Sequence, residues 1–228
     1  MQQLTNHLVD LGYPPCEGNI MVSNPYWCKT ADEYKTDITK WINSPDMKSY
    51  LDLAIFIDAF AVAGDKELLI NLKEYLYNKI QSKDIFMAYF AKSTLAFDTP
   101  TTFSSFMAKD DLINIKKAAI FPIVQGIRSL ALKEKIKETT TIKRIKILEA
   151  RNILEKTKAA ELIEAFEIAS TLRLKNQLDC IQEGVALTNE INTNDLGKIE
   201  RDLLKESFKI VVEFKKFINY IFKLDKIY

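Results

Sequence analysis

Glycine is scarce in this chain, with only 6 residues in 228. Average usage would give roughly 16 in a chain of this length. Turn-rich β architectures and glycine-rich phosphate loops both need residues that reach positive φ easily, and glycine supplies most of them. Hydrophobic residues make up 47% of the chain, which is enough apolar material for a packed core. The composition therefore predicts a mainly helical, globular protein.

Charge and cysteine content narrow the classes of protein further. The chain has 32 Lys and Arg against 31 Asp and Glu, a formal net charge of +1, whereas a dedicated nucleic-acid binder carries a clear basic excess. Cys16, Cys28 and Cys180 are too scattered for a disulfide framework or a zinc site. No apolar stretch approaches the roughly 18 residues of a membrane span. We therefore expect a cytoplasmic protein with no membrane partner and no cysteine-bound metal, and the charge balance argues against a nucleic-acid partner.

Capping and turn signals organise the N-terminal part of the chain. Residues 1–11 are predicted to form a short amphipathic helix that ends at Gly12. The stretch 12–27 holds two of the six glycines and three of the six prolines, so we expect a loop, in which residues 20–22 could form a short strand. A capping-box pattern begins at Thr30 and predicts the start of a second helix.

The most apolar run of the chain, residues 51–63, is interrupted only by Asp52 and Asp58. Such a run indicates a buried element, and periodicity does not decide between helix and strand. A carboxylate inside it must be paired, bound to a metal, or on an exposed face. Asp58 is therefore either a metal or substrate ligand or a solvated residue on the wet side of a helix.

The sequence from residue 118 onward has helical patterns throughout, and we predict helices at 122–135, 140–152, 157–183 and 196–224. The last two are about 40 Å long if straight. Each carries an apolar stripe, formed by Leu162, Phe166, Ala169 and Leu172 in one and by Leu203, Ile210, Phe214, Phe217 and Ile221 in the other. Two such stripes favour an antiparallel pair of helices in a bundle, joined by a polar loop at 184–194. Upstream, residues 103–115 could form a small hairpin.

A basic pair precedes one of these helices. Lys116 and Lys117 come shortly before Pro122, which suits the first turn of a helix, and Arg128 lies further along. Because the free N–H groups and positive dipole of a helix start favour an anion, these residues could bind a phosphate. The alternative is a basic pair in a loop.

A second polar group lies on the first long helix. Arg173 and Gln177 are four residues apart and therefore share one helix face. A guanidinium beside a side-chain amide could grip a phosphate or a base. Alternatively, Arg173 could pair with Glu167 or Asp179 on its own helix.

Most sequence signatures of autonomous catalysis are missing. His7 is the only histidine, so a catalytic triad would depend on a residue in the first turns of the chain. The chain contains no dinucleotide or P-loop glycine motif, no H-E-x-x-H and no C-x-x-C. The residues alone therefore favour a binding or interaction role over catalysis.

Several longer motifs, taken in order along the chain, resemble a known family. They are GYPPCEGNIMVSNPYW, IDAFAVAGD, INIKKAAIFPIV, RSLAL, TTIKR, EAFEIASTLRLKNQL and LGKIERDLLKES. In this order they resemble the C-terminal portion of bacterial nucleotidyltransferases related to the uridylyltransferase that modifies the PII nitrogen-signalling protein. Members of that family carry sensor domains, a nucleotidyltransferase domain with a Gly-Ser turn and an Asp-x-Asp strand, and then a helical substrate-binding domain.

The resemblance implies particular site residues. An F-F-D-x-R motif of the family falls on Asp58, although its arginine is replaced by Phe60 here. A D-L-K-K-x-G-L-F-P-I-V motif falls on residues 114–124, with Asn114 and Ala119 in place of the acid and the glycine. The residues implied in substrate binding are Lys116, Lys117, Arg128, Arg144, Arg173 and Gln177, and Asp58 is a weaker candidate for a catalytic role.

The resemblance also implies a domain organisation and two candidate functions. Residues 1–97 resemble the end of a nucleotidyltransferase domain, a small α/β remnant, and residues 98–228 the helical substrate-binding domain. The first candidate function is substrate recognition for a uridylyltransferase-like enzyme whose catalytic motif, Mg²⁺ and nucleoside triphosphate lie outside this chain, with a nucleotide or a protein as acceptor. The second is a catalytically silent interaction module that passes a signal from upstream sensor domains. The long helices could also mediate homodimerisation.

Overall fold

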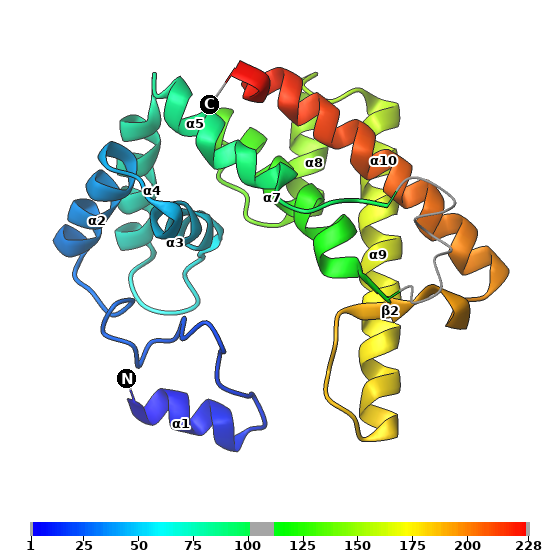
Figure 1. Ribbon diagram of the computed structural model, residues 1–228. Coiled ribbons are helices and arrows are strands. Elements are labelled where there is room, and N and C mark those ends of the chain that lie inside the picture. The colour runs from blue at the N-terminus through cyan, green and yellow to red at the C-terminus, as the bar shows by residue number, and fades with distance from the viewer. Residues whose placement is uncertain (1, 101–111, 227–228) are drawn as a thin grey trace. The chain divides into compact units, whose positions relative to one another are not determined.

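The computed structural model describes residues 2–100 and 112–226, and it is mainly α-helical, as the composition predicts (Figure 1). The chain divides into two compact units. Unit 1 comprises residues 1–53 and 60–81, and unit 2 comprises residues 54–59 and 82–228. In the described part of the chain, no helix is long and apolar enough to cross a bilayer.

Unit 1 contains α1 (Gln2–Asp10), α2 (Ala31–Asn43), the first part of α3 (Met47–Asp58) and α4 (Lys66–Ile80). The capping box predicted at Thr30 is confirmed, because its hydroxyl accepts from the Glu33 N–H and the Glu33 side chain accepts from the Thr30 N–H. Helix α2 packs against α4, with Ile38, Trp41, Leu72 and Leu76 buried.

The strand considered for residues 20–22 is wrong, because the backbone there forms turns. Asn19 has φ of +53°, and the Asn24 N–H donates to the carbonyl oxygen of Met21 at 3.0 Å. The side-chain amide of Asn24 also donates to the Asn19 carbonyl oxygen, at 2.8 Å, and this second hydrogen bond stabilises the turn. The described residues of unit 1 therefore form helices, turns and irregular loops, with no strand.

The apolar run at 51–63 is a helix only as far as Asp58, where α3 ends. Leu53, Phe56 and Ile57 are buried, whereas Phe60 is 71% exposed. After an irregular stretch the chain turns at Gly64, which takes φ of +81°, and Asp65 caps the next helix by accepting from the Glu67 N–H at 2.9 Å. Asp58 consequently stands at a helix end, where its side chain can reach other elements.

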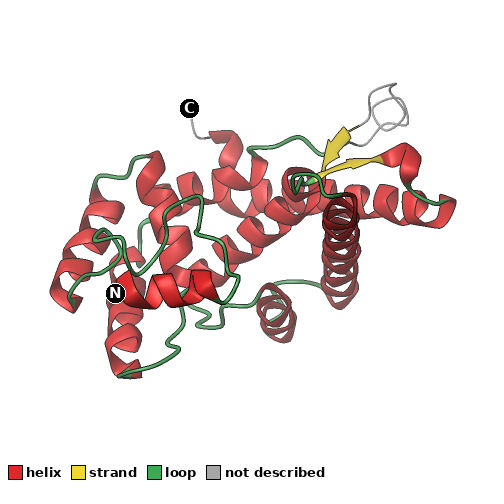
Figure 2. Ribbon diagram, turned by 90° about the horizontal axis from the view of Figure 1, so that it is seen from below, coloured by secondary structure: helices red, strands yellow, loops and turns green. Residues whose placement is uncertain are grey.

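Unit 2 is built around two long helices, α9 (Lys156–Glu183) and α10 (Lys198–Phe222), which pack against each other as an antiparallel pair (Figures 1 and 2). Helices α5 (Asp84–Lys92), α7 (Phe121–Lys133) and α8 (Thr141–Ala150) complete the bundle. Short 3₁₀ turns occur at Ser93–Leu95, Thr193–Asp195 and Leu224–Lys226. The helical bundle predicted for this part of the chain is thus confirmed.

The face of α10 that is most deeply buried differs from the predicted stripe. Leu204, Phe208, Val211, Ile218 and Phe222 are buried, while Leu203 is 41% exposed. The predicted residues Ile210, Phe217 and Ile221 are intermediate in burial, and only Phe214 is shared by both sets. Because α10 is apolar along two neighbouring stripes, its spacing alone does not tell which stripe is covered completely.

A two-stranded sheet links distant parts of unit 2. Strand β1 (Leu112–Asn114) pairs antiparallel with β2 (Glu190–Asn192), with Ile113 opposite Ile191. The hairpin considered for 103–115 falls largely on residues outside the described part of the chain. Within the described part, the strand partner of β1 comes from the segment between the long helices, which was expected to be only a loop.

Candidate functional site

Asp58 lies between two arginines of unit 2. Its Oδ2 accepts from Nε and Nη2 of Arg128 at 3.0 and 2.5 Å, and its Oδ1 accepts from Nη1 of Arg144 at 2.7 Å. The side chain of Arg144 is 3% exposed and that of Asp58 is 29% exposed. Asp58 is therefore paired with two arginines and is not a solvated residue on the wet side of a helix. Helices α3, α7 and α8 meet at its carboxylate.

The two arginines are held by further hydrogen bonds. Nη1 of Arg128 donates to Oε1 of Gln125 at 2.6 Å, and the amide nitrogen of Gln125 donates to the Phe90 carbonyl oxygen at 3.1 Å. Nε of Arg144 donates to the carbonyl oxygen of Glu138 at 2.6 Å. We call Asp58, Gln125, Arg128 and Arg144 the Asp58 cluster. Both guanidinium groups thus have hydrogen-bond acceptors besides Asp58, as buried charges require.

A divalent cation does not fit the Asp58 cluster. Both carboxylate oxygens already accept from guanidinium groups, and two arginines against one carboxylate leave a positive excess. Among residues 2–100 and 112–226, no three His, Cys, Asp or Glu side chains gather as a metal site. Asp58 therefore serves as the ion-pair partner of two arginines.

Glu138 supports Arg144 and also begins the turn before α8. Its Oε1 accepts from the backbone N–H groups of Thr139 and Thr140 at 2.7 and 3.0 Å and from the Thr140 hydroxyl at 3.0 Å. These hydrogen bonds, the Thr140 N–H foremost, lower the pKa of Glu138 to about 2. The ionised carboxylate thus stabilises the backbone whose carbonyl oxygen holds Arg144.

We expect this carboxylate to make unit 2 sensitive to acid. The pKa is 4.5 without these partners and about 2 in the fold, so the stabilisation is complete above pH 4.5 and is lost as the pH falls toward 2. Solvent reaches the side chain, so we expect Glu138→Gln to lower the free energy of unfolding at pH 7 by only about 1 kcal/mol. Urea unfolding should show this gap at pH 7 and little gap at pH 2. Parallel pH profiles of the two proteins would contradict the assignment.

Lys116 and Lys117 lie at the start of the segment that leads into α7, and Arg173 lies on α9. We call these three residues the helix-start cluster. Nε of Arg173 donates to Oδ1 of Asn189 at 2.6 Å, and the carbonyl oxygen of Asn189 accepts from the Ile115 N–H at 2.9 Å. Asn189 therefore joins the long helix α9 to the turn that carries the two lysines. The alternative pairing of Arg173 with Glu167 or Asp179 is not the one that the structure shows.

The sequence predicted a helix start at Pro122, but the helical segment begins several residues before it. A π-helical turn, η2 (Lys116–Ile120), runs directly into α7, and the Phe121 N–H donates to the Lys116 carbonyl oxygen. Proline lacks the N–H that would satisfy the Ala118 carbonyl oxygen, which instead accepts from the Thr99 hydroxyl at 2.8 Å. The first turn is partly capped already, since the Lys117 N–H donates to Oδ1 of Asn114 at 3.1 Å.

The structure thus separates the residues predicted to bind substrate into two groups. Lys116 and Arg128 lie twelve residues apart on one continuous helical segment, which is about 18 Å along its axis. Gln177 lies one turn from Arg173 on α9, near the helix-start cluster. Arg128 and Arg144 belong to the Asp58 cluster. Sequence reasoning missed Asn189, because an uncharged residue in a loop carries no pattern.

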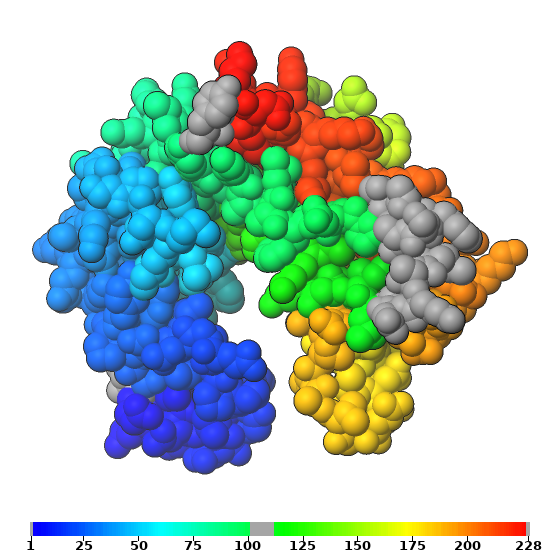
Figure 3. Space-filling model, viewed as in Figure 1, coloured from blue at the N-terminus to red at the C-terminus, as the bar shows by residue number. Residues whose placement is uncertain are grey.

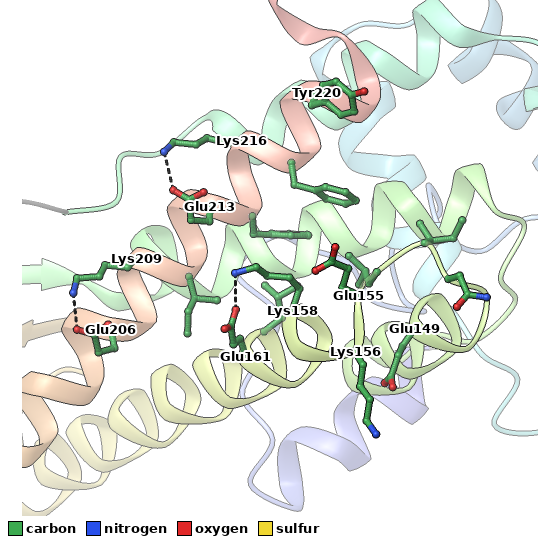
Figure 4. Close-up of a pocket in the computed structure, with 17 residues that line it drawn as sticks. Glu149, Glu155, Lys156, Lys158, Glu161, Glu206, Lys209, Glu213, Lys216 and Tyr220 are labelled. Atoms are coloured by element: carbon green, nitrogen blue, oxygen red, sulfur yellow. Dashed lines mark hydrogen bonds and ion pairs between the residues drawn. The ribbon is translucent and has the colours of Figure 1, made fainter.

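A groove of about 1160 Å³ lies between α9, α10 and the segment that joins α8 to α9 (Figure 4). Its apolar lining consists of Ile153, Leu154, Leu162, Ile210, Phe214 and Phe217. Three lysines on its rim pair with glutamates at 2.6 to 2.9 Å, namely Lys158 with Glu161, Lys209 with Glu206 and Lys216 with Glu213. None of the residues predicted to bind substrate lines this groove.

Comparison with protein families identifies the chain. Residues 84–222, more than half of its length, match the family described as "Putative nucleotidyltransferase substrate binding domain". The chain belongs to this family. Residues 1–48 match a second family, described as "Putative nucleotidyltransferase DUF294". Comparison with curated proteins and with solved structures gave no significant match.

The substrate-binding domain match contains most of the polar residues described above. The helix-start cluster, Arg128, Arg144 and the groove all fall within residues 84–222. Asp58 lies between the two matched ranges. Its two arginines nevertheless come from the substrate-binding domain, at sequence separations of 70 and 86 residues.

Proposed function

We propose that this substrate-binding domain recognises an anionic group of the nucleotidyl-transfer substrate through Lys116, Lys117 and Arg173. One observation carries the proposal. Within residues 2–100 and 112–226, no carboxylate forms an ion pair with any of these three side chains, although several other lysines and arginines of unit 2 are paired. Three neighbouring unpaired cations make a field that favours a phosphate.

The side chains of the cluster and its neighbours support the same proposal. The side chains of Lys116 and Lys117 are exposed, and Nζ of Lys117 lies 5.4 Å from the ring centre of Phe97. Arg173 is fixed through Nε, which leaves its terminal nitrogens to form the two parallel hydrogen bonds that suit phosphate oxygens. Gln177, one turn away, adds an amide that could contact a base or a ribose.

We assign the transfer chemistry itself to residues outside these 228. The sequence contains no Gly-Ser dipeptide and no Asp-x-Asp triplet, the pattern that would hold Mg²⁺ and the triphosphate in the family that it resembles. In this proposal the chain presents a nucleotide or a protein acceptor to a uridylyltransferase-like active site in bacterial signal transduction. Substrate contacts by Arg128 and Arg144 stay a prediction, since Asp58 already engages both guanidinium groups.

Calorimetry with UTP or ATP and Mg²⁺ tests the proposal. We expect measurable binding to the 228-residue chain and a loss of at least about tenfold in affinity in the double variant Lys117→Ala, Arg173→Ala, because hydrogen bonds to charged groups contribute about 1.5–3 kcal/mol each. The matched control is Lys146→Ala, Lys198→Ala, which removes the same charge from exposed positions of the same unit. The melting temperatures of both variants should stay near that of the wild type.

Two results would contradict the proposal. Equal losses of affinity in the two double variants would show that only overall charge matters. An absence of heat and of any thermal shift at millimolar nucleotide would exclude nucleotide binding by this chain, and would favour the catalytically silent interaction module.

A further inference from the structure

The second apolar stripe of α10 is only partly covered, because it lines the groove between α9, α10 and the α8–α9 segment. Ile210 and Phe217 of this stripe are intermediate in burial, and Tyr220, which extends it, is 80% exposed. In Figure 3 the C-terminal half of α10 (orange to red) lies on the molecular surface, with yellow-green atoms of the α8–α9 segment beside it. Exposed apolar surface rimmed by polar residues is typical of interaction sites.

The groove is long enough for a helix. Its α10 wall extends from Glu206 to Tyr220, which is about 21 Å at 1.5 Å per residue. Its other walls come from the start of α9 and the segment before it. The volume of about 1160 Å³ exceeds the roughly 300–1,000 Å³ of most small-molecule pockets. A space of this length beside packed helices is the kind that receives the apolar face of another helix.

Most charges on the rim of the groove are neutralised within the rim itself. Lys158, Lys209 and Lys216 each pair with a glutamate three residues away on the same helix. Such exposed pairs contribute little to stability, and they do not favour either sign of charge in a ligand. The lining nevertheless holds five glutamates against four lysines, so the groove has a negative excess.

Glu155 is the carboxylate that stands apart from these pairs. It occupies the N-cap position of α9, yet its side chain makes no capping hydrogen bond. Lys158, one turn later, pairs with Glu161 at 2.9 Å, and no described residue forms an ion pair with Glu155. In Figure 4 its carboxylate lies on the side of the α8–α9 segment that faces α10, whereas the Lys156 side chain extends away from α10. Because Ser, Thr, Asp and Asn are the residues that cap helices well, capping does not account for this glutamate.

We propose that this groove binds an amphipathic α-helix of a protein partner, whose apolar side chains contact Ile210 and Phe217 and whose Lys or Arg pairs with Glu155. Aromatic rings and a carboxylate in one groove favour such a cation, which interacts with both. A nucleic acid would set phosphates against the glutamates of the rim, and an acidic helix would set a carboxylate against Glu155. The groove is separate from the proposed anion site, because no member of the helix-start cluster lines it.

Two synthetic peptides of about 18 residues, about 27 Å long as helices, test the proposal. Both carry leucines at alternating spacings of three and four residues on an alanine-rich background. One has arginines beside the central leucines, and the other has glutamates at the same positions. We expect fluorescence anisotropy with the 228-residue chain to give a Kd below about 100 μM for the arginine peptide. The glutamate peptide should bind at least about threefold more weakly, because its carboxylates meet Glu155.

Substitutions in the groove locate the bound peptide. Ile210→Asn should weaken binding of the arginine peptide at least about fivefold, because the peptide would bury an amide without partners. Tyr220→Ser, at a position that is 80% exposed, should weaken it at least about twofold, and it keeps the test valid should Ile210→Asn lower the melting temperature. The matched control is Leu178→Asn, which removes an apolar side chain that is 49% exposed outside the groove and should leave binding unchanged.

A charge reversal tests the role of Glu155. Glu155→Lys should reverse the preference, so that the glutamate peptide binds at least about threefold more tightly than the arginine peptide. The control is Glu167→Lys, which makes the same change at an exposed position of α9 outside the groove and should keep the wild-type preference.

The proposal is wrong if neither peptide binds, or if Leu178→Asn weakens binding as much as Ile210→Asn does. An unchanged preference for the arginine peptide in Glu155→Lys would exclude a basic partner residue at Glu155. Self-association of the wild-type chain that Ile210→Asn abolishes, measured by sedimentation equilibrium, would assign the groove to a second copy of the chain instead. The affinity for UTP should be the same in every groove variant, so the proposed function is tested separately.

Discussion

Replacing Asp58 by alanine is expected to lower the free energy of unfolding of unit 2 by about 3 kcal/mol. The carboxylate compensates one of the two positive charges of Arg128 and Arg144. Its removal leaves both charges uncompensated, with little solvent around Arg144, whose side chain is 3% exposed. Breaking a buried ion pair costs more than the pair contributes, because the remaining charge stays desolvated. Urea unfolding followed by circular dichroism measures the loss.

Two further variants make the Asp58 prediction specific. Asp202→Ala removes an exposed carboxylate from α10 and should change stability by no more than about 0.5 kcal/mol. The double variant Asp58→Ala, Arg144→Met should recover part of the lost free energy of unfolding, since it also removes the more buried of the two unpaired charges. A single-variant loss below about 1 kcal/mol would show that solvent or another group compensates the arginines.

Local signals account for what the sequence predicted well. The capping box at Thr30 and the glycine stop at Gly12 act within a few residues of themselves, and both occur as predicted. The long helices α9 and α10 were predicted because their periodicity extends over many turns. Such features depend on neighbours in the sequence, which are visible without a structure.

Long-range partners account for what the sequence could not predict. The unusual position of Asp58 in an apolar run indicated a special role, but its arginines lie 70 and 86 residues away. Proline at 122 indicated a helix start, whereas the Thr99 hydroxyl compensates for its missing N–H and allows the helix to begin earlier. The second strand went unpredicted because three residues between polar loops carry too little pattern.

Gly126 lies on α7 where this helix closely approaches Phe214 of α10, and substituting it is expected to cause the other large loss of stability. A Cβ at this position would lie 2.5 Å from Cε1 and 2.8 Å from Cζ of Phe214, both far below normal contact. Phe214 is buried, so its ring must move or the helices must separate. Overpacking of a core costs about 1–3 kcal/mol, and we expect Gly126→Ala to reach the upper end of that range.

A smaller side chain at position 214 should relieve the same clash. Phe214→Leu alone loses packing and should cost about 1 kcal/mol or more. Combined with Gly126→Ala, it should cost clearly less than the sum of the two single losses, because each change makes room for the other. Gly18→Ala is the control, since a Cβ there would meet Ile20 at an ordinary 3.5 Å. Additive losses in thermal and urea unfolding would mean that α7 and α10 do not depend on glycine for their approach, and that the scarce glycine at 126 has no packing role.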